Sequence, residues 1–118
     1  MVLKGHTLTA RGLEFADATT VISASRDTTL RIWDLHTGEC LRVLEGHEKT
    51  IRAIAVHGDI VVSASYDGQA RVWNWRSGEC LHVLKEHTKQ VYSVVFDGDL
   101  IATGSLDNTV RVWNPNLG

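Results

Sequence analysis

A histidine, a hydroxyl-bearing residue and an aspartate recur together in this chain, and these are the residue types of a nucleophilic triad. In such a triad the aspartate orients the imidazole, which takes the proton of the hydroxyl. Here, however, three sets occur within 118 residues, each with a tryptophan six residues after its aspartate. The sets are His6, Ser23, Asp27 and Trp33; His47, Ser63, Asp67 and Trp73; and His87, Thr103, Asp107 and Trp113. This repetition indicates a structural unit, so we expect no catalytic residue and no enzymatic activity.

The four side chains of each set can form one chain of hydrogen bonds. An indole N–H, a hydroxyl, an imidazole and a carboxylate satisfy one another between strands, where an unpaired polar group costs about 1–3 kcal/mol. The hydroxyl could instead come from a serine two residues later, which is Ser25, Ser65 or Ser105. The sequence leaves both choices open.

The spacing of the sets gives the architecture. The three tryptophans lie 40 residues apart, as do the three aspartates. In the middle repeat, residues 50–56, 60–65, 69–75 and 80–84 are rich in strand-forming residues and are separated by short turns, among them Asp67-Gly68. No segment has a helical period. Each repeat is therefore predicted to form four antiparallel strands.

A period near 40 residues, with a histidine, a hydroxyl, an aspartate and a tryptophan at fixed places in each repeat, resembles the blades of WD-repeat β-propellers. The predicted fold class is all-β: a propeller segment of three four-stranded antiparallel blades. The repeats are predicted at approximately residues 1–38, 39–78 and 79–118.

Composition narrows the function classes. Twelve basic and 14 acidic residues give a net charge of −2, which disfavours a nucleic-acid or membrane surface as partner. Cys40 and Cys80 occupy equivalent places in neighbouring repeats, too far apart to pair, which favours a reduced, intracellular protein of the cytoplasm or nucleus. Cys80 and His82 lack further ligands at suitable spacing, so neither a metal nor a cofactor is expected.

Two positions differ between the repeats while the scaffold positions are kept. Five residues after the histidine stand Arg11, Arg52 and Tyr92, and just before the aspartate stand Arg26, Tyr66 and Leu106. Both positions should lie at the top face of a propeller, near its central channel. Three arginines beside two tyrosines suit an anionic ligand with an apolar body, and guanidinium groups match phosphate oxygens. The alternative is that these arginines are solvated or pair with nearby carboxylates.

The chain also resembles three consecutive blades of the substrate-binding propeller of F-box/WD-repeat proteins, most closely the fungal cell-division-control members. These proteins are substrate receptors of SCF-type ubiquitin ligases. The resemblance rests on residues 25–34, 57–63, 91–93 and 102–107. It implies that Arg11, Arg26 and Arg52 bind the phosphothreonine of a degron and that Tyr66 and Tyr92 line the same pocket.

The chain departs from that family in several ways. The family propeller has eight blades and an F-box, whereas this sequence has three blades and no F-box. Glu86 replaces the usual glycine before His87, and Ala10 replaces the usual valine before Arg11. The resemblance therefore implies phosphopeptide binding without ligase activity. The second hypothesis is a structural, truncated or engineered building block that retains no ligand.

Residues 2–6 match residues 43–47, so the chain opens with the end of an outer, fourth strand, while residue 118 precedes the fourth strand of the last blade. These ends could complete one another between copies. We expect a homo-oligomeric ring, with a trimer slightly favoured over a dimer, and with a phosphorylated peptide as the other possible partner.

Overall fold

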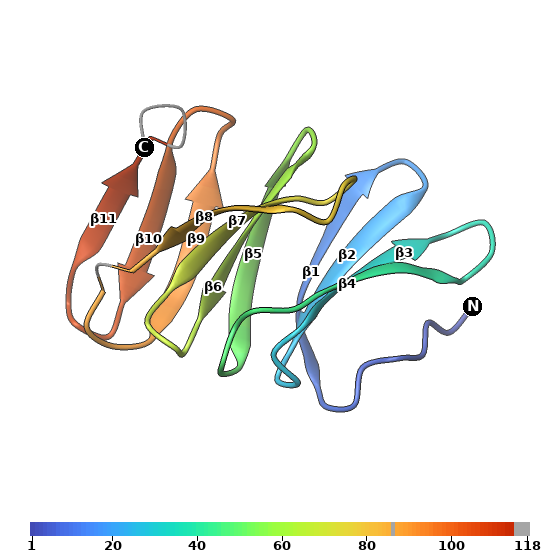
Figure 1. The fold of residues 1–118 in the computed structure, drawn as a ribbon, viewed down its shortest axis with the longest axis horizontal. Helices are drawn as coiled ribbons and strands as arrows, with labels where there is room; N and C mark the ends of the chain where they lie inside the picture. The colour runs from blue at the N-terminus through green and yellow to red at the C-terminus, as the bar shows by residue number, and fades with distance from the viewer. Residues whose placement is uncertain (86, 115–118) are drawn as a thin grey trace.

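A computed structural model of the protein describes residues 1–85 and 87–114. These residues form eleven β-strands in three antiparallel sheets that stand side by side (Figure 1). They contain no helix long and apolar enough to cross a membrane. The predicted all-β fold class is confirmed.

Each sheet is one blade, and its strands follow one another in sequence order; the fourth strand of each of the first two blades lies just beyond the predicted repeat ends at residues 38 and 78. The first sheet contains β1 (Ala10–Asp17), β2 (Thr20–Ser25), β3 (Leu30–Asp34) and β4 (Cys40–Leu44). The second contains β5 (Ile51–His57), β6 (Ile60–Ser65), β7 (Ala70–Asn74) and β8 (Cys80–Leu84). The third contains β9 (Val91–Phe96), β10 (Ile101–Ser105) and β11 (Val110–Trp113). The inner strands β1, β5 and β9 are neighbours.

The strand bounds differ slightly from the predicted ones. β5 begins at Ile51 and extends to His57, and β7 is shorter at both ends than the predicted residues 69–75. Residues 1–9 contain no strand, so the segment at residues 2–4, predicted to be the end of an outer strand, pairs with no strand among the described residues. The third sheet has three strands among the described residues, and the end of the predicted third repeat, residues 115–118, lies outside them.

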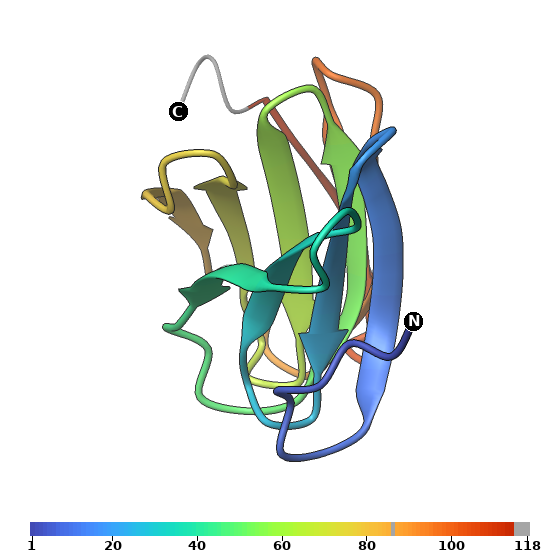
Figure 2. The same cartoon turned by 90° about the vertical axis from the view of Figure 1, so that its right-hand side faces the viewer.

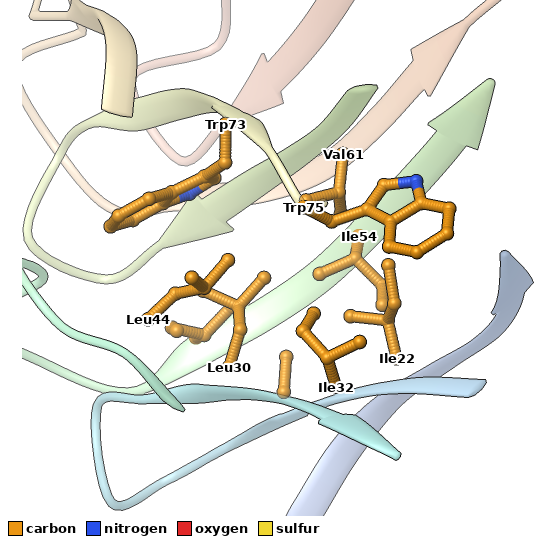
Figure 3. Packing of buried hydrophobic residues seen from close by; sticks show 10 residues of the cluster. Ile22, Leu30, Ile32, Leu44, Ile54, Val61, Trp73 and Trp75 are labelled. Carbon is orange, nitrogen blue, oxygen red and sulfur yellow. The ribbon is translucent and has the colours of Figure 1, made fainter. Parts of the chain in front are cut away.

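Apolar side chains from facing sheets fill the two gaps between them. Between the first and second sheets, Ile22, Leu30 and Ile32 pack against Val61 and Trp73 (Figure 3). Between the second and third sheets, Val62 and Val72 pack against Ile101 and Trp113. The view along the stack shows the sheets overlapping face to face (Figure 2). Each blade thus buries one face against its neighbour, and the middle blade buries both.

The turn after each aspartate places one residue in the left-handed region. Gly68 has φ +83°, Thr28 has φ +76° and Asn108 has φ +68°. Glycine adopts this conformation without a Cβ clash, whereas a β-branched residue is strained there. The Asp67-Gly68 turn therefore matches its backbone conformation better than the turn at Thr28.

Candidate functional site

The middle blade shows how the four recurring side chains are joined. Trp73 Nε1–H donates to Ser63 Oγ at 2.9 Å, and His47 Nε2 lies 2.6 Å from the same oxygen. His47 Nδ1 lies 2.8 Å from Asp67 Oδ2. Because the carboxylate can only accept, Nδ1 carries the proton and Nε2 accepts the Ser63 hydroxyl. The result is an unbroken chain of hydrogen bonds from the indole to the carboxylate.

The other two blades repeat this arrangement. In the first, Ser23 Oγ lies 2.7 Å from Trp33 Nε1 and 2.6 Å from His6 Nε2. In the third, Thr103 Oγ1 lies 3.1 Å from Trp113 Nε1 and 2.7 Å from His87 Nε2. The histidines bond to Asp27 at 2.8 Å and to Asp107 at 3.0 Å. We refer to these three hydrogen-bonded sets as the tetrads.

The choice between the two hydroxyls is resolved by the strand register. Ser63 pairs with Arg71 across β6 and β7, which places it next to Trp73 on the same face. Ser65 lies two residues further along β6, on the same face, and its Oγ donates to the carbonyl of Thr50 at 2.9 Å. It also accepts the backbone N–H of Asp67 at 3.1 Å. The later serines, Ser25 and Ser105 included, thus close the top turns rather than joining the tetrads.

The aspartates are held ionised by donors from several directions. Burial of Asp27 opposes ionisation, but hydrogen bonds from Thr29 and His6 and from backbone amides outweigh it and lower its pKa to about 2. The pKa of Asp67 is also lowered, since bonds from His47 and from backbone amides overcome its burial. For Asp107 the bond from Thr109 is the main cause of a lowered pKa. All three carboxylates therefore favour the folded state while ionised.

The tetrads have the hydrogen bonds of a nucleophilic triad but not its accessibility. Ser63 is 0% exposed, and its oxygen is already bonded to both His47 and Trp73. A substrate carbonyl has no route to this oxygen without disrupting the interior of the blade. The chemistry available to the tetrads is therefore the satisfaction of buried polar groups.

At the top of the second and third blades, three of the predicted ligand residues are in contact. The rings of Tyr66 and Tyr92 have centroids 5.7 Å apart, and the guanidinium carbon of Arg52 lies 5.7 Å from the centroid of the Tyr92 ring. Tyr92 is exposed and Tyr66 is half-buried. These three side chains form a basic, aromatic surface at one end of β5 and β9.

Arg11 and Arg26 occupy the same positions one blade earlier. Arg11, Arg52 and Tyr92 each stand at a register shift near the start of an inner strand. The backbone N–H of Arg26 donates to the carbonyl of Thr9 at 2.9 Å, which fixes the top turn beside the start of β1. Both arginine side chains are exposed. We call Arg11, Arg26, Arg52, Tyr66 and Tyr92 the rim cluster.

The rim arginines have no acidic counterpart in the part of the chain that the structure describes. None of the ion pairs found there includes Arg11, Arg26 or Arg52. The Nε of Arg52 is buried and has no hydrogen-bond acceptor among the described residues. The described residues thus contain no carboxylate paired with Arg26 or Arg52, and the exposed side chains of Arg11 and Arg26 are also compatible with the other alternative, solvated arginines.

The sequence interpretation missed a polar hollow beside the rim cluster. This hollow of about 220 Å³ is lined by Lys49, Tyr66, Lys89 and Gln90, among others, from the second and third repeats. A signal was present, because Lys49 and Lys89 both follow their histidine by two residues, where the first repeat has Leu8. Two further cations, together with Asp67, thus lie around a hollow beside Tyr66.

No group of three or more histidine, cysteine, aspartate or glutamate side chains in residues 1–85 and 87–114 could hold a metal ion. Cys40 and Cys80 are both free thiols. The thiol of Cys40 contacts the carbonyl of Arg42 at 3.2 Å, and that of Cys80 contacts the carbonyl of His82 at 3.6 Å. The Cys80 thiol thus contacts the backbone carbonyl of His82 and not its imidazole, so the pair does not form two ligands of a metal site.

Comparison with known proteins places these features in a family. The family model described as "WD domain, G-beta repeat" matches residues 1–34, 38–74 and 78–114. Mitochondrial division protein 1 of Aspergillus clavatus is 48% identical over 42 residues, which are 36% of this chain and 6% of that protein. The protein of the same name from Aspergillus niger is 45% identical over 42 residues, again 36% and 6% of the two chains.

A third relative is the WD repeat-containing protein pop1 of Schizosaccharomyces pombe. It is 51% identical over 37 residues, which are 31% of this chain and 5% of pop1. Each of these matches is about one repeat long, and the chain spans only a small part of the curated relatives it matches. The family matches, by contrast, cover nearly the whole chain. The chain belongs to the WD-repeat family and is a WD-repeat protein-interaction module.

Proposed function

We propose that this module binds a phosphorylated segment of a partner protein through the rim cluster. The observation that carries the proposal is the contact of Arg52 with Tyr92, and of Tyr92 with Tyr66, in a surface without a neutralising carboxylate among the described residues. Guanidinium groups bind phosphate oxygens through paired hydrogen bonds, and a phosphate carries about −1.5 to −2 charges at neutral pH. The tyrosines provide apolar surface for the residues beside the phosphate.

The geometry favours a peptide over a small free anion. Arg11 and Arg26 belong to the first blade, whereas Arg52, Tyr66 and Tyr92 lie at the tops of the second and third. A ligand that contacts all five residues must therefore extend across blades. This is the binding mode implied by the resemblance to F-box/WD-repeat receptors, here without an F-box.

The test is a titration with a phosphothreonine peptide that has apolar flanking residues, alongside its unphosphorylated twin. The phosphorylated peptide should bind and the twin should not, and binding should weaken as salt is raised. Because hydrogen bonds to charged groups contribute about 1.5–3 kcal/mol, Arg26→Ala should weaken binding tenfold or more. Arg76→Ala is the matched control, since Arg76 pairs with Asp17 and Asp59 at the opposite end of the blades. Equal binding of the two peptides, or of neither, would contradict the proposal.

A second function is favoured by a separate observation. Both outer faces of the stack carry exposed apolar side chains, among them Phe15, at 69% exposure, and Val112, at 64%. Contiguous apolar patches of several hundred square ångströms are rare on monomers and mark interaction sites. We propose that copies of the chain associate into a closed ring, with three copies favoured slightly over two. Light scattering at tens of micromolar tests this, because a mass of 13.1 kDa would show a monomer and contradict it.

A further inference from the structure

The strand register shows that each blade presents two distinct apolar rows. A front row faces the preceding blade and a back row faces the following one. In the second blade, Val61 pairs with Val56 and Trp73, and these three form the front row. Val62 pairs with Ala55 and Val72, and these form the back row. Neighbouring positions of one strand point to opposite faces, so the two rows cannot share a face.

Front and back rows meet at both internal contacts between blades. The front row of the second blade belongs to the same packed cluster as Ile22 and Ile32 of the first. The back row of the second blade packs with the front row of the third, which consists of Phe96, Ile101 and Trp113. A front row therefore always packs against a back row, and both contacts follow the same rule.

One face of each kind meets no other sheet among the described residues. On the front face of the first blade, Phe15 is 69% and Leu13 is 67% exposed, whereas Val21 and Trp33 are already buried beside the N-terminal segment. The third blade presents a back row of Val95, Ala102 and Val112. Val95 is 66% exposed, whereas its counterpart Ala55 packs in the core. The two open faces are thus of opposite kinds and complementary.

We infer that the back row of the third blade packs on the front row of the first blade of a second copy, head to tail. This inference rests on the proposed self-association and specifies its interface. The two internal contacts differ in size at this position: Ala70 shares a cluster with Val91, whereas Leu30 shares one with Ile51. The equivalent pair between copies would be Val110 with Ala10, which matches the smaller of these two pairs in total volume.

The N-terminal segment supports the same pairing. Leu3 precedes His6 by three residues, as Leu44 precedes His47, and Leu44 is buried between the first and second blades. Leu3 lines a hollow of about 110 Å³ on the open front face together with Leu13 and Trp33. Leu44 pairs with Leu30 across β3 and β4, and Leu84 pairs with Ala70 across β7 and β8. By the same register, Leu3 of the second copy would pair with Val110 and add a fourth strand beside β11.

A heterologous contact of this kind has a distinctive signature in mixtures. Val112→Glu damages only the back row of the third blade, and Phe15→Arg damages only the front row of the first. Each variant alone should be a monomer of 13.1 kDa. Their equimolar mixture should form a 1:1 dimer and stop there, because one intact back row meets one intact front row. Leu41→Glu, at a 53% exposed residue of β4 on neither row, is the control and should assemble like the unmodified chain.

The outcomes distinguish the head-to-tail pairing from the self-association on which it rests. The unmodified chain should have a mass of about 39 kDa for three copies or about 26 kDa for two, as multiples of 13.1 kDa, and removing residues 1–4 should weaken the assembly. If the unmodified chain is a monomer, another partner covers these faces, and both the self-association and the head-to-tail pairing are wrong. If it assembles but the two variants do not form a dimer when mixed, self-association stands and the head-to-tail pairing is overturned. The circular dichroism spectrum of each variant shows whether it is folded.

Discussion

His47 Nε2 lies 2.6 Å from Ser63 Oγ, as in a nucleophilic triad, but the serine oxygen also accepts the indole N–H of Trp73 at 2.9 Å. His47 is 5% exposed and Ser63 is fully buried. The Ser63 hydroxyl is therefore enclosed in the blade and bonded to both side chains. One hydrogen-bond donor thus converts an arrangement known for catalysis into an internal support of the blade.

The first prediction follows from this burial. A fluorophosphonate probe, which labels activated serines, should leave the folded protein unmodified. The Ser63→Ala variant serves as the matched control, because it has no hydroxyl at this position. Stoichiometric labelling that disappears in Ser63→Ala would contradict the structural role of the tetrad.

The second prediction concerns the indole donors. Trp73→Phe keeps most of the ring bulk and removes the N–H, so Ser63 loses a partner and the free energy of unfolding should fall by about 1–3 kcal/mol. Trp113→Phe should cost less, because Trp113 is only half-buried and its bond is longer, at 3.1 Å. Urea denaturation of the three proteins measures both changes. A loss at Trp113 larger than that at Trp73 would contradict this order.

The third prediction is a loss of stability in acid. The pKa of Asp27 is lowered to about 2 in the folded protein, from an ordinary value near 3.9. A group whose pKa is lower when folded stabilises the protein above its unfolded pKa and loses that contribution as pH falls through the folded value. The free energy of unfolding should therefore fall between about pH 4 and pH 2, with Asp67 and Asp107 acting in the same direction.

Denaturation series at pH 7, 4 and 3 measure this dependence. Asp27→Asn should be less stable at pH 7 and should lose part of its acid sensitivity, because its amide does not titrate. Equal stability of the unmodified protein at pH 7 and pH 3 would show that the carboxylates are not specifically stabilised in the folded state.

The fourth prediction concerns the top turns. Thr28 has φ +76°, where a β-branched residue is strained, and Gly68 fills the equivalent place with φ +83°. Thr28→Gly should raise the free energy of unfolding by about 1 kcal/mol, since the relief of the left-handed strain exceeds the added flexibility of the unfolded chain. The reciprocal change Gly68→Thr should be destabilising. If both substitutions lower stability by the same amount, side-chain contacts rather than backbone strain control these turns.

Much of the scaffold could be predicted from the sequence because its chemistry is local and repeated. The tetrad residues are set by their spacing, since a histidine, a hydroxyl and a tryptophan recur with the same separations. The choice between Ser23 and Ser25 could not be made in this way. Both residues lie on the same face of one strand, two positions apart, and only the pairing of Ser23 with Arg31 shows which one reaches Trp33.

The rim cluster was harder to predict because it depends on contacts between repeats. The sequence placed Arg52 and Tyr92 at equivalent positions, but their contact requires the separation of neighbouring inner strands. The hollow beside them could not be predicted from differences between the repeats, because the second and third repeats both have a lysine there, Lys49 and Lys89. Comparison of the repeats does not distinguish residues that two blades share from scaffold residues.

The most direct test of phosphopeptide binding observes the arginine side chains themselves. In nuclear magnetic resonance spectra, the Nε–H signals of Arg11, Arg26 and Arg52 should shift together as the phosphothreonine peptide is added, and should reach saturation at the same peptide concentration. Arg31 and Arg71 provide the internal control, because their guanidinium groups lie beside the rings of Trp33 and Trp73. The small Gly5 and Gly46 leave room for this packing. The account predicts shifts confined to the rim arginines, with none from the unphosphorylated twin. Shifts at Arg31 and Arg71 without shifts at the rim, or no shifts at all, would contradict it.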